Sequence, residues 1–148
     1  MILNVKNFQL NYKNAIYDCV VPCSLYSVLL QNGVIEDPYY GENETKYIDI
    51  ARQDCSFVST FDIPGEILNN DRVELRLLGV DTLADVFLNG TLLGKCNNMH
   101  RTWTFDIAGI ANERDNKLVL YFHSPLNYTD RCQEQHKIYA PDCSYPGY

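Results

Sequence analysis

The chain has 148 residues, 46% of them hydrophobic, which is enough for one core in a domain of ordinary size. Nineteen acidic against twelve basic residues give a net charge of -7, which disfavours nucleic-acid binding because phosphate recognition depends on clustered Lys and Arg. The sequence has neither the roughly 20 consecutive apolar residues of a membrane span nor the pattern of a signal peptide. We therefore expect a soluble, cytoplasmic domain without nucleic-acid or membrane partners.

The N-terminal part of the chain predicts a strand followed by a short helix. Apolar and polar residues alternate through residues 3–12, but the phase changes between residues 6 and 7, where we expect a β-bulge. Ser24 is a suitable cap for a helix whose apolar face includes Val28, and the Gly33 that follows Asn32 supplies its end. We expect this helix to act as a plug at the edge of the core.

Further strands and one hairpin follow. Residues 57–63 and 72–78 predict the next two strands, joined by the turn-rich segment PGEILNND. Asn89 and Gly90 lie between two apolar runs, and a two-residue turn with both φ angles positive favours these two residues. The sequence therefore predicts a tight β-hairpin at this point.

The last strands and the C-terminal segment differ in pattern. Apolar and polar residues alternate in residues 102–107 and again in 117–123, which is the period of strands that bury one face. Strands at this spacing, without helices between them, predict an all-β jelly-roll β-sandwich with one short helical insertion. We assign residues 1–125 to the sandwich and residues 126–148 to a polar segment without a clear period that leads toward further domains.

The hairpin region also carries a resemblance to a known family. Residues 81–107, DTLADVFLNGTLLGKCNNMHRTWTFDI, resemble the sugar-binding-type β-sandwich domain that opens glycoside hydrolases of family 2, the β-galactosidase, β-glucuronidase and β-mannosidase superfamily. Residues 21–44, VPCSLYSVLLQNGVIEDPYYGENE, and the tripeptide at 97–99 resemble the β-mannosidase branch in particular. The resemblance covers about residues 3–125 and implies a galactose-binding-domain-like sandwich.

The resemblance implies an accessory role. In this superfamily both catalytic glutamates lie on a downstream (β/α)₈ barrel of about 250 residues, which cannot fit in this chain. We therefore expect an excised N-terminal domain that walls the active-site pocket and braces the barrel of a retaining exo-glycosidase acting on a β-linked saccharide. On this reading the fragment has no catalytic residue and needs no cofactor, whereas its full-length parent is an enzyme. The alternative is an independent carbohydrate-binding module.

A first group of candidate sugar-binding residues lies in the segment DPYYGENE. Tyr39 and Tyr40 supply rings that can stack on the CH face of a sugar, and Asn43 and Glu44 supply partners for its hydroxyls. The alternative is a loop shaped by its proline and glycine, whose tyrosines pack on the sandwich or on a neighbouring domain.

A second group follows the hairpin. By resemblance, Asn98, Met99 and His100 face the catalytic cleft of the parent, where the Asn98 amide would help to orient the terminal sugar. The alternative is a polar loop that leads into the next strand. His100 and His123 are poor candidates for general acids, because neither has a partner carboxylate nearby in the sequence.

The cysteines and aspartates do not predict a metal site. Zinc needs four ligands at tight spacing, and the pair Cys19 and Cys23 has no matching second pair. A calcium site would require Asp81, Asp85 and Asp106 to converge, whereas aspartates at strand ends more often bond to nearby amides. We expect reduced, mostly packed thiols at all six cysteines, which are Cys19, Cys23, Cys55, Cys96, Cys132 and Cys143.

Overall fold

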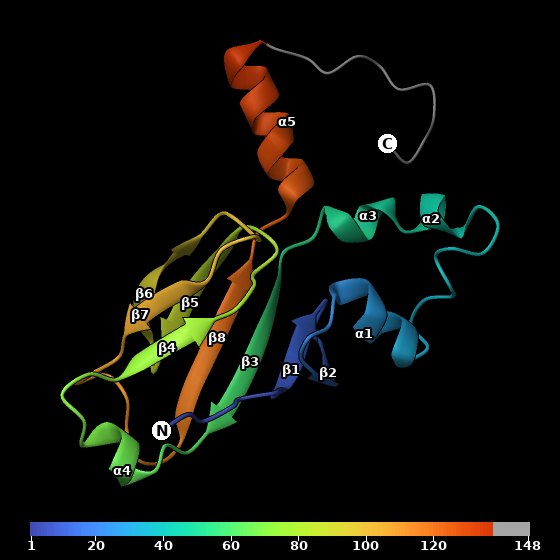
Figure 1. Ribbon diagram of the computed structural model, residues 1–148. Coiled ribbons are helices and arrows are strands. Elements are labelled where there is room, and N and C mark those ends of the chain that lie inside the picture. The colour runs from blue at the N-terminus through green and yellow to red at the C-terminus, as the bar shows by residue number, and fades with distance from the viewer. Residues whose placement is uncertain (138–148) are drawn as a thin grey trace.

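The computed structural model describes residues 1–137, and its strands form a sandwich with α3 and α5 at one end and α4 at the other (Figure 1). The elements in chain order are β1 (Asn7–Tyr12), β2 (Ala15–Val20), α1 (Leu25–Gln31), α2 (Asn43–Lys46), α3 (Ile48–Ala51), β3 (Cys55–Phe61), α4 (Gly65–Leu68), β4 (Glu74–Leu77), β5 (Ala84–Leu88), β6 (Thr91–Cys96), β7 (Trp103–Asp106), β8 (Asn116–Phe122) and α5 (Pro125–His136).

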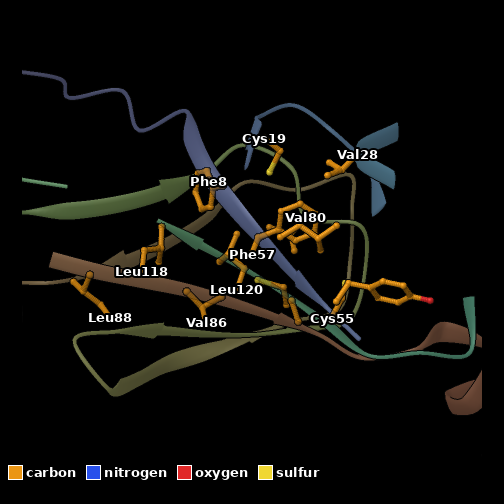
Figure 2. Close-up of a cluster of buried hydrophobic side chains, with 14 of the residues drawn as sticks. Phe8, Cys19, Val28, Cys55, Phe57, Val80, Val86, Leu88, Leu118 and Leu120 are labelled. Carbon is orange, nitrogen blue, oxygen red and sulfur yellow. The ribbon is translucent and has the colours of Figure 1, made fainter. Parts of the chain in front are cut away.

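The larger sheet has six antiparallel strands in the order β2-β1-β3-β8-β5-β6. Along each strand, alternate side chains point to the same face. In β5, for example, Ala84, Val86 and Leu88 are at most 1% exposed. Val86 and Leu88 lie opposite the buried Leu120 and Leu118 of β8. These side chains form the floor of the hydrophobic core, which Figure 2 shows in close-up.

The second layer combines a small sheet with a helix. In the β4-β7 pair, Leu75 faces Phe105 across the strands and packs on the core, while the polar neighbours point outward. Helix α1 contacts β2 and buries Val28 and Leu29 completely. Each of these two side chains contributes about 1.5–3 kcal/mol by burial. The predicted β-sandwich and its helical plug are therefore confirmed.

The capping and turn residues act as the sequence predicts. Ser24 caps α1 by accepting a hydrogen bond from the Ser27 amide at 3.1 Å, and Gly33 follows the helix with φ +67°. Asn89 and Gly90 adopt φ +52° and +82° between β5 and β6, a turn whose twist matches that of the paired strands. The predicted tight β-hairpin is confirmed.

Several boundaries and elements differ from the prediction. The first strand begins at Asn7 and pairs with β2 without a register shift, so the phase change between residues 6 and 7 marks the start of the strand and not a bulge. Strand β2 was missed because its outward face carries Ile16 and Val20, which hide the alternation.

The expectation of one helical insertion is wrong, because the described residues contain four helices besides α1. Helices α2, α3 and α4 have four residues each, too few to show a 3.6-residue period. Helix α5 has twelve residues, begins at Pro125 after the cap Ser124, and buries none of its side chains, so it lacks an apolar stripe. Within residues 1–137, none of the helices has the length and apolar character that crossing a bilayer requires. The remainder of the predicted polar segment, with Cys143, lies outside the described residues.

Candidate functional site

Strand pairing brings several chain segments to one end of the sandwich. At one end of these four strands, Cys55 lies opposite Phe122, Phe122 lies opposite Ala84, and Ala84 lies opposite Cys96. The segments that precede β3 and β5 and the segments that follow β6 and β8 therefore meet at one end. We call it the β8 end; helices α3 and α5 lie there in Figure 1.

A polar network crosses this end. The Nε2 atom of His123 lies 3.1 Å from an oxygen of Asp85, and its Nδ1 atom lies 3.9 Å from an oxygen of Asp54. Lys95 forms an ion pair with Asp85 at 3.2 Å, and the Tyr121 hydroxyl donates to Asp54 at 3.0 Å. The imidazole lies between the two carboxylates, so a sugar ring has no place between them.

The network shifts the pKa values of two of its members. Partial burial of Asp85 by itself raises the pKa of its carboxyl, but the hydrogen bonds from His123 and Lys95 outweigh this and leave the pKa below its usual value. The hydrogen bond to Asp54 raises the pKa of the Tyr121 hydroxyl, and desolvation adds to the effect. The Asp85 carboxyl is therefore held in its charged form.

A cleft of about 450 Å³ opens beside this network, between the sheet and α5. The Ser124 backbone N–H donates to Asp54 at 2.8 Å, and its hydroxyl donates to the carbonyl of Ala51 at 2.7 Å. Arg52 forms an ion pair with Asp130 at 2.6 Å, so the start of α5 is tied to the segment between α3 and β3. The residues that line the cleft are Asp54, His123, Ser124, Asn127, Asp130 and Arg131.

Sequence reasoning missed this cleft. The sequence offers no carboxylate close to His123 along the chain, yet the side chain of Asp85, 38 residues away in the sequence, contacts its imidazole in the folded protein. The only sequence signal is that Asp85, Tyr121 and Lys95 occupy outward positions of their strands, and it becomes informative only when the order of the strands is known.

The first predicted group lies on the segment that leads through α2. Tyr39 is 96% exposed and Tyr40 is 78% exposed, so neither ring packs on the sandwich. Glu44 is also exposed, on α2. Both tyrosine rings are therefore accessible to a ligand or to another domain.

Asn43 of the same group is placed differently. It is 7% exposed, its amide nitrogen donates to the carbonyl of Asp37 at 3.0 Å, and its amide oxygen accepts from Lys46 at 2.7 Å. In this structure its side chain braces the loop that carries the two tyrosines.

The second predicted group forms a folded loop after β6. The side-chain oxygen of Asn98 accepts from the His100 backbone N–H at 2.8 Å, and the backbone carbonyl of Asn98 accepts from the Trp103 indole N–H at 3.1 Å. The Arg101 guanidinium lies 4.2 Å from the centre of the Trp103 ring, a distance typical of cation–π stacking. Met99 is 44% exposed, and His100 is exposed as well.

The two groups of predicted residues lie on separate segments. Figure 1 shows α2 on one side of the β8 end and the β6–β7 loop on the other, with α3 and the start of α5 between them. Asp106 accepts from the Ala108 N–H at 3.0 Å, Asp81 accepts from the Thr82 hydroxyl, and Asp85 belongs to the polar network, so the three aspartates weighed as calcium ligands have other partners. No three metal-ligating side chains converge within residues 1–137, and the five cysteines of that range are free thiols.

Comparisons with known proteins agree with this architecture. Residues 6–148 match the family described as glycosyl hydrolase 2 galactose-binding domain-like. The chain is 34% identical to β-mannosidase of Mus musculus over 125 residues, which are 83% of this chain and 14% of that protein. It is 33% identical to β-mannosidase of Capra hircus over 128 residues, which are 85% of this chain and 14% of that protein. The chain thus spans only a small part of these relatives.

Solved structures share the fold. The crystal structure of β-D-mannosidase from Dictyoglomus thermophilum superposes with a TM-score of 0.85 at 25% identity, over 95% of this chain and 17% of that one. The exo-chitosanase of Amycolatopsis orientalis superposes with a TM-score of 0.68 at 18% identity, over 80% of this chain and 16% of that one. At that identity the second likeness concerns the fold alone.

Proposed function

This chain belongs to the glycosyl hydrolase 2 galactose-binding domain-like family, and we propose that it is the N-terminal, non-catalytic domain of a β-mannosidase-like glycoside hydrolase. The observation that carries the proposal is the polar cleft at the β8 end, which has an exposed loop on each side of it, one with two tyrosines and one with Asn98. In the whole protein this end walls one side of a pocket for a β-linked saccharide.

The residues of the β8 end orient a sugar and leave bond cleavage to another domain. Tyr39 and Tyr40 offer apolar ring faces, and the loop of Asn98 to His100 offers polar partners for hydroxyls. Retaining hydrolysis needs two carboxyl groups about 5–5.5 Å apart across the sugar. Asp54 and Asp85 flank an imidazole instead, so they serve as structural charges.

The outer face of the large sheet supports a bracing role. Val58, Val119, Phe87 and Leu92 lie side by side across four strands and point away from the core. Leu92 is 48% exposed, and the other three are half-buried. An apolar row of this kind on a sheet face suits contact with another domain of the same polypeptide.

The alternative, an independent carbohydrate-binding module, is favoured by one observation, the nearly complete exposure of Tyr39 and Tyr40. A free-standing module has to hold a sugar on its own surface, whereas an accessory domain shares the contacts with its neighbours. The two functions therefore differ in the affinity of the isolated chain for a mannoside.

An NMR titration of the isotopically labelled chain with methyl β-D-mannopyranoside separates them. If the domain is accessory, we expect no saturable change in chemical shift up to about 50 mM ligand, because one side of a pocket makes too few contacts to bind the sugar alone. A saturable shift at millimolar ligand or below that disappears in Tyr39→Ala or Tyr40→Ala, but persists in the matched control Tyr128→Ala on α5, would establish the module instead.

A further inference from the structure

Strand β2 forms an open edge of the larger sheet. It stands first in the order β2-β1-β3-β8-β5-β6 and pairs with β1 alone among the described strands (Figure 1). The Val21 N–H donates to the Lys6 carbonyl at 2.9 Å, and these two residues continue the register of the pair. Because hydrogen-bonded positions alternate along an antiparallel strand, the backbone groups of Ile16, Asp18 and Val20 point away from β1.

These backbone groups are accessible. Ile16 is 64% exposed, Val20 is 60% exposed, and Asp18 between them is exposed as well. No hydrogen bond of the turns, loops or side chains within residues 1–137 uses the N–H or C=O groups of these three residues. The edge therefore presents a row of donors and acceptors with which another strand can pair.

The edge lacks the features that usually prevent such pairing. Edge strands are commonly protected by lysine, by proline or by a β-bulge. The strand at the opposite edge, β6, has Lys95 and a shift of register against β5. Strand β2 has the sequence AIYDCV and pairs with β1 without a shift, so it is suited to accept a further strand.

The side chains along the edge define the chemistry of a partner. Asp18 is the one charged residue of β2, and none of the ion pairs within residues 1–137 includes it. The apolar Ile16 and Val20 lie on the same face, two residues before and two residues after it. The net charge of the chain is -7, so both the local and the overall charge favour a basic partner.

A groove beside the edge has room for a long basic side chain. Its volume is about 730 Å³, and Asp18, Val20, Val58 and Gln31 of α1 are among the residues that line it. The amide nitrogen of Gln9 donates to Asp18 at 3.0 Å, which leaves the amide oxygen of Gln9 as an acceptor for a guanidinium or an ammonium group. The valines suit the methylene groups of such a side chain.

We propose that β2 binds an extended peptide segment that carries arginine or lysine between two β-branched apolar residues at alternate positions. The segment adds as an antiparallel strand, as in every other pair of this sheet. Because residues directly opposite each other point to the same face, its basic side chain lies beside Asp18 and its apolar side chains pack on Ile16 and Val20. No residue of β2 lines the cleft at the β8 end, so this inference does not depend on the proposed sugar site.

The experiment titrates the isotopically labelled chain with the peptide acetyl-Thr-Val-Thr-Arg-Thr-Val-Thr-amide and follows the amide signals by NMR. We expect saturable changes in chemical shift that are centred on β2. Hydrogen exchange of the Ile16, Asp18 and Val20 amides should slow, because these N–H groups gain acceptors, whereas the amides of Tyr17 and Cys19, which face β1, should change less.

Modified peptides test the pairing of the backbones. In the proposed register the N–H of the central arginine points to β2, and the N–H of the threonine that follows it points to solvent. Methylation of the arginine nitrogen should therefore abolish binding, whereas methylation of that threonine nitrogen, the matched control, should leave it.

Exchange of charges tests the role of Asp18. Glutamate in place of the central arginine should weaken binding at least about tenfold, and Asp18→Lys should weaken the binding of the arginine peptide as much. Asp18→Lys should bind the glutamate peptide instead. The matched control Asp71→Lys changes the net charge equally and should bind the arginine peptide as the wild type does.

Three results with the wild-type chain overturn the proposal: no saturable shift with the arginine peptide, equal affinity for the arginine and glutamate peptides, or unchanged affinity for the peptide methylated at arginine. Sedimentation of the chain without peptide provides the last test. A dimer in which the Ile16, Asp18 and Val20 amides are protected would assign the edge to a second copy of the chain, and would also overturn the proposal.

Discussion

The side-chain oxygen of Asn116, at the start of β8, accepts a hydrogen bond at 3.0 Å from the amide of Asn89 in the β5–β6 turn. The same oxygen accepts from the Asn112 N–H at 2.8 Å, and the amide nitrogen donates to the carbonyls of Asn112 and Phe61 at 2.6 and 3.3 Å. Asn116 is 0% exposed. One buried amide thus ties the hairpin turn to β3 and to the loop before β8.

Replacement of this amide is expected to be costly. Asn116→Ala leaves several buried donors and acceptors without partners, and we expect it to lower the free energy of unfolding by about 2–3 kcal/mol. Urea denaturation measures the change. Asn112→Ala is the matched control, because its backbone and not its side chain bonds to Asn116, and it should change the free energy by less than about 0.5 kcal/mol. Equal effects of the two substitutions would refute this role of Asn116.

The hydroxyl groups of Tyr12 and Tyr26 differ in their hydrogen bonding. The Tyr12 hydroxyl is buried and has no hydrogen-bond partner within the described part of the chain, whereas the Tyr26 hydroxyl donates to the carbonyl of Tyr47 at 3.0 Å. We expect Tyr12→Phe to be neutral or slightly stabilising and Tyr26→Phe to cost about 1 kcal/mol. Thermal unfolding of the two variants gives the comparison, and a loss at Tyr12 as large as that at Tyr26 would show that the Tyr12 hydroxyl is satisfied.

The contact between the two sheets predicts a steric effect at Gly94. A Cβ atom at this position would lie 2.7 Å from the Phe105 ring, whereas at Gly79 its nearest neighbour is the Met99 carbonyl oxygen at 3.7 Å. We expect Gly94→Ala to destabilise the protein by about 1–3 kcal/mol and Gly79→Ala to have little effect. In a double-mutant cycle, Phe105→Leu should relieve part of the Gly94→Ala penalty. Simple additivity of the two substitutions would argue against the clash.

The polar network at the β8 end predicts an acid-sensitive contribution to stability. Because the folded-state pKa of Asp85 lies below the ordinary value of 3.8, its contribution is present above that value and is lost as the pH falls through the lower, folded-state pKa. Asp85→Asn should therefore remove about 1 kcal/mol at neutral pH and flatten the stability profile below about pH 4. Urea unfolding from pH 3 to pH 7 tests this, with the exposed Asp71→Asn as control. If Asp85→Asn loses stability at acid pH as the wild type does, the network is not the cause of that loss.

The sequence predicted the elements whose local signals are strong. The hairpin at Asn89 and Gly90, helix α1 with its cap Ser24, and the alternation of Leu118 and Leu120 in β8 all depend on neighbours in the chain. Helix α5 could not be predicted in this way, because it buries no side chain. Its cap at Ser124 is a local signal, but an isolated cap without an apolar stripe is weak.

The candidate site was predictable only in part. The two loops around Tyr39 and Asn98 stand out by composition, and the structure places them on opposite sides of the β8 end. The network of His123 with Asp54 and Asp85 depends on β3 and β5 both pairing with β8, and the spacing of residues along the chain does not encode that order of strands. The sugar-binding roles of the loop residues stay predictions.

The proposal that this domain has no catalytic role is tested most directly by measuring the hydrolysis of 4-nitrophenyl β-D-mannopyranoside by the purified chain. Because His123 separates Asp54 from Asp85, we expect the release of nitrophenol to equal that of buffer alone. Saturable turnover that falls in both Asp54→Asn and Asp85→Asn would contradict the non-catalytic role, since it would mean that these carboxylates act on a substrate.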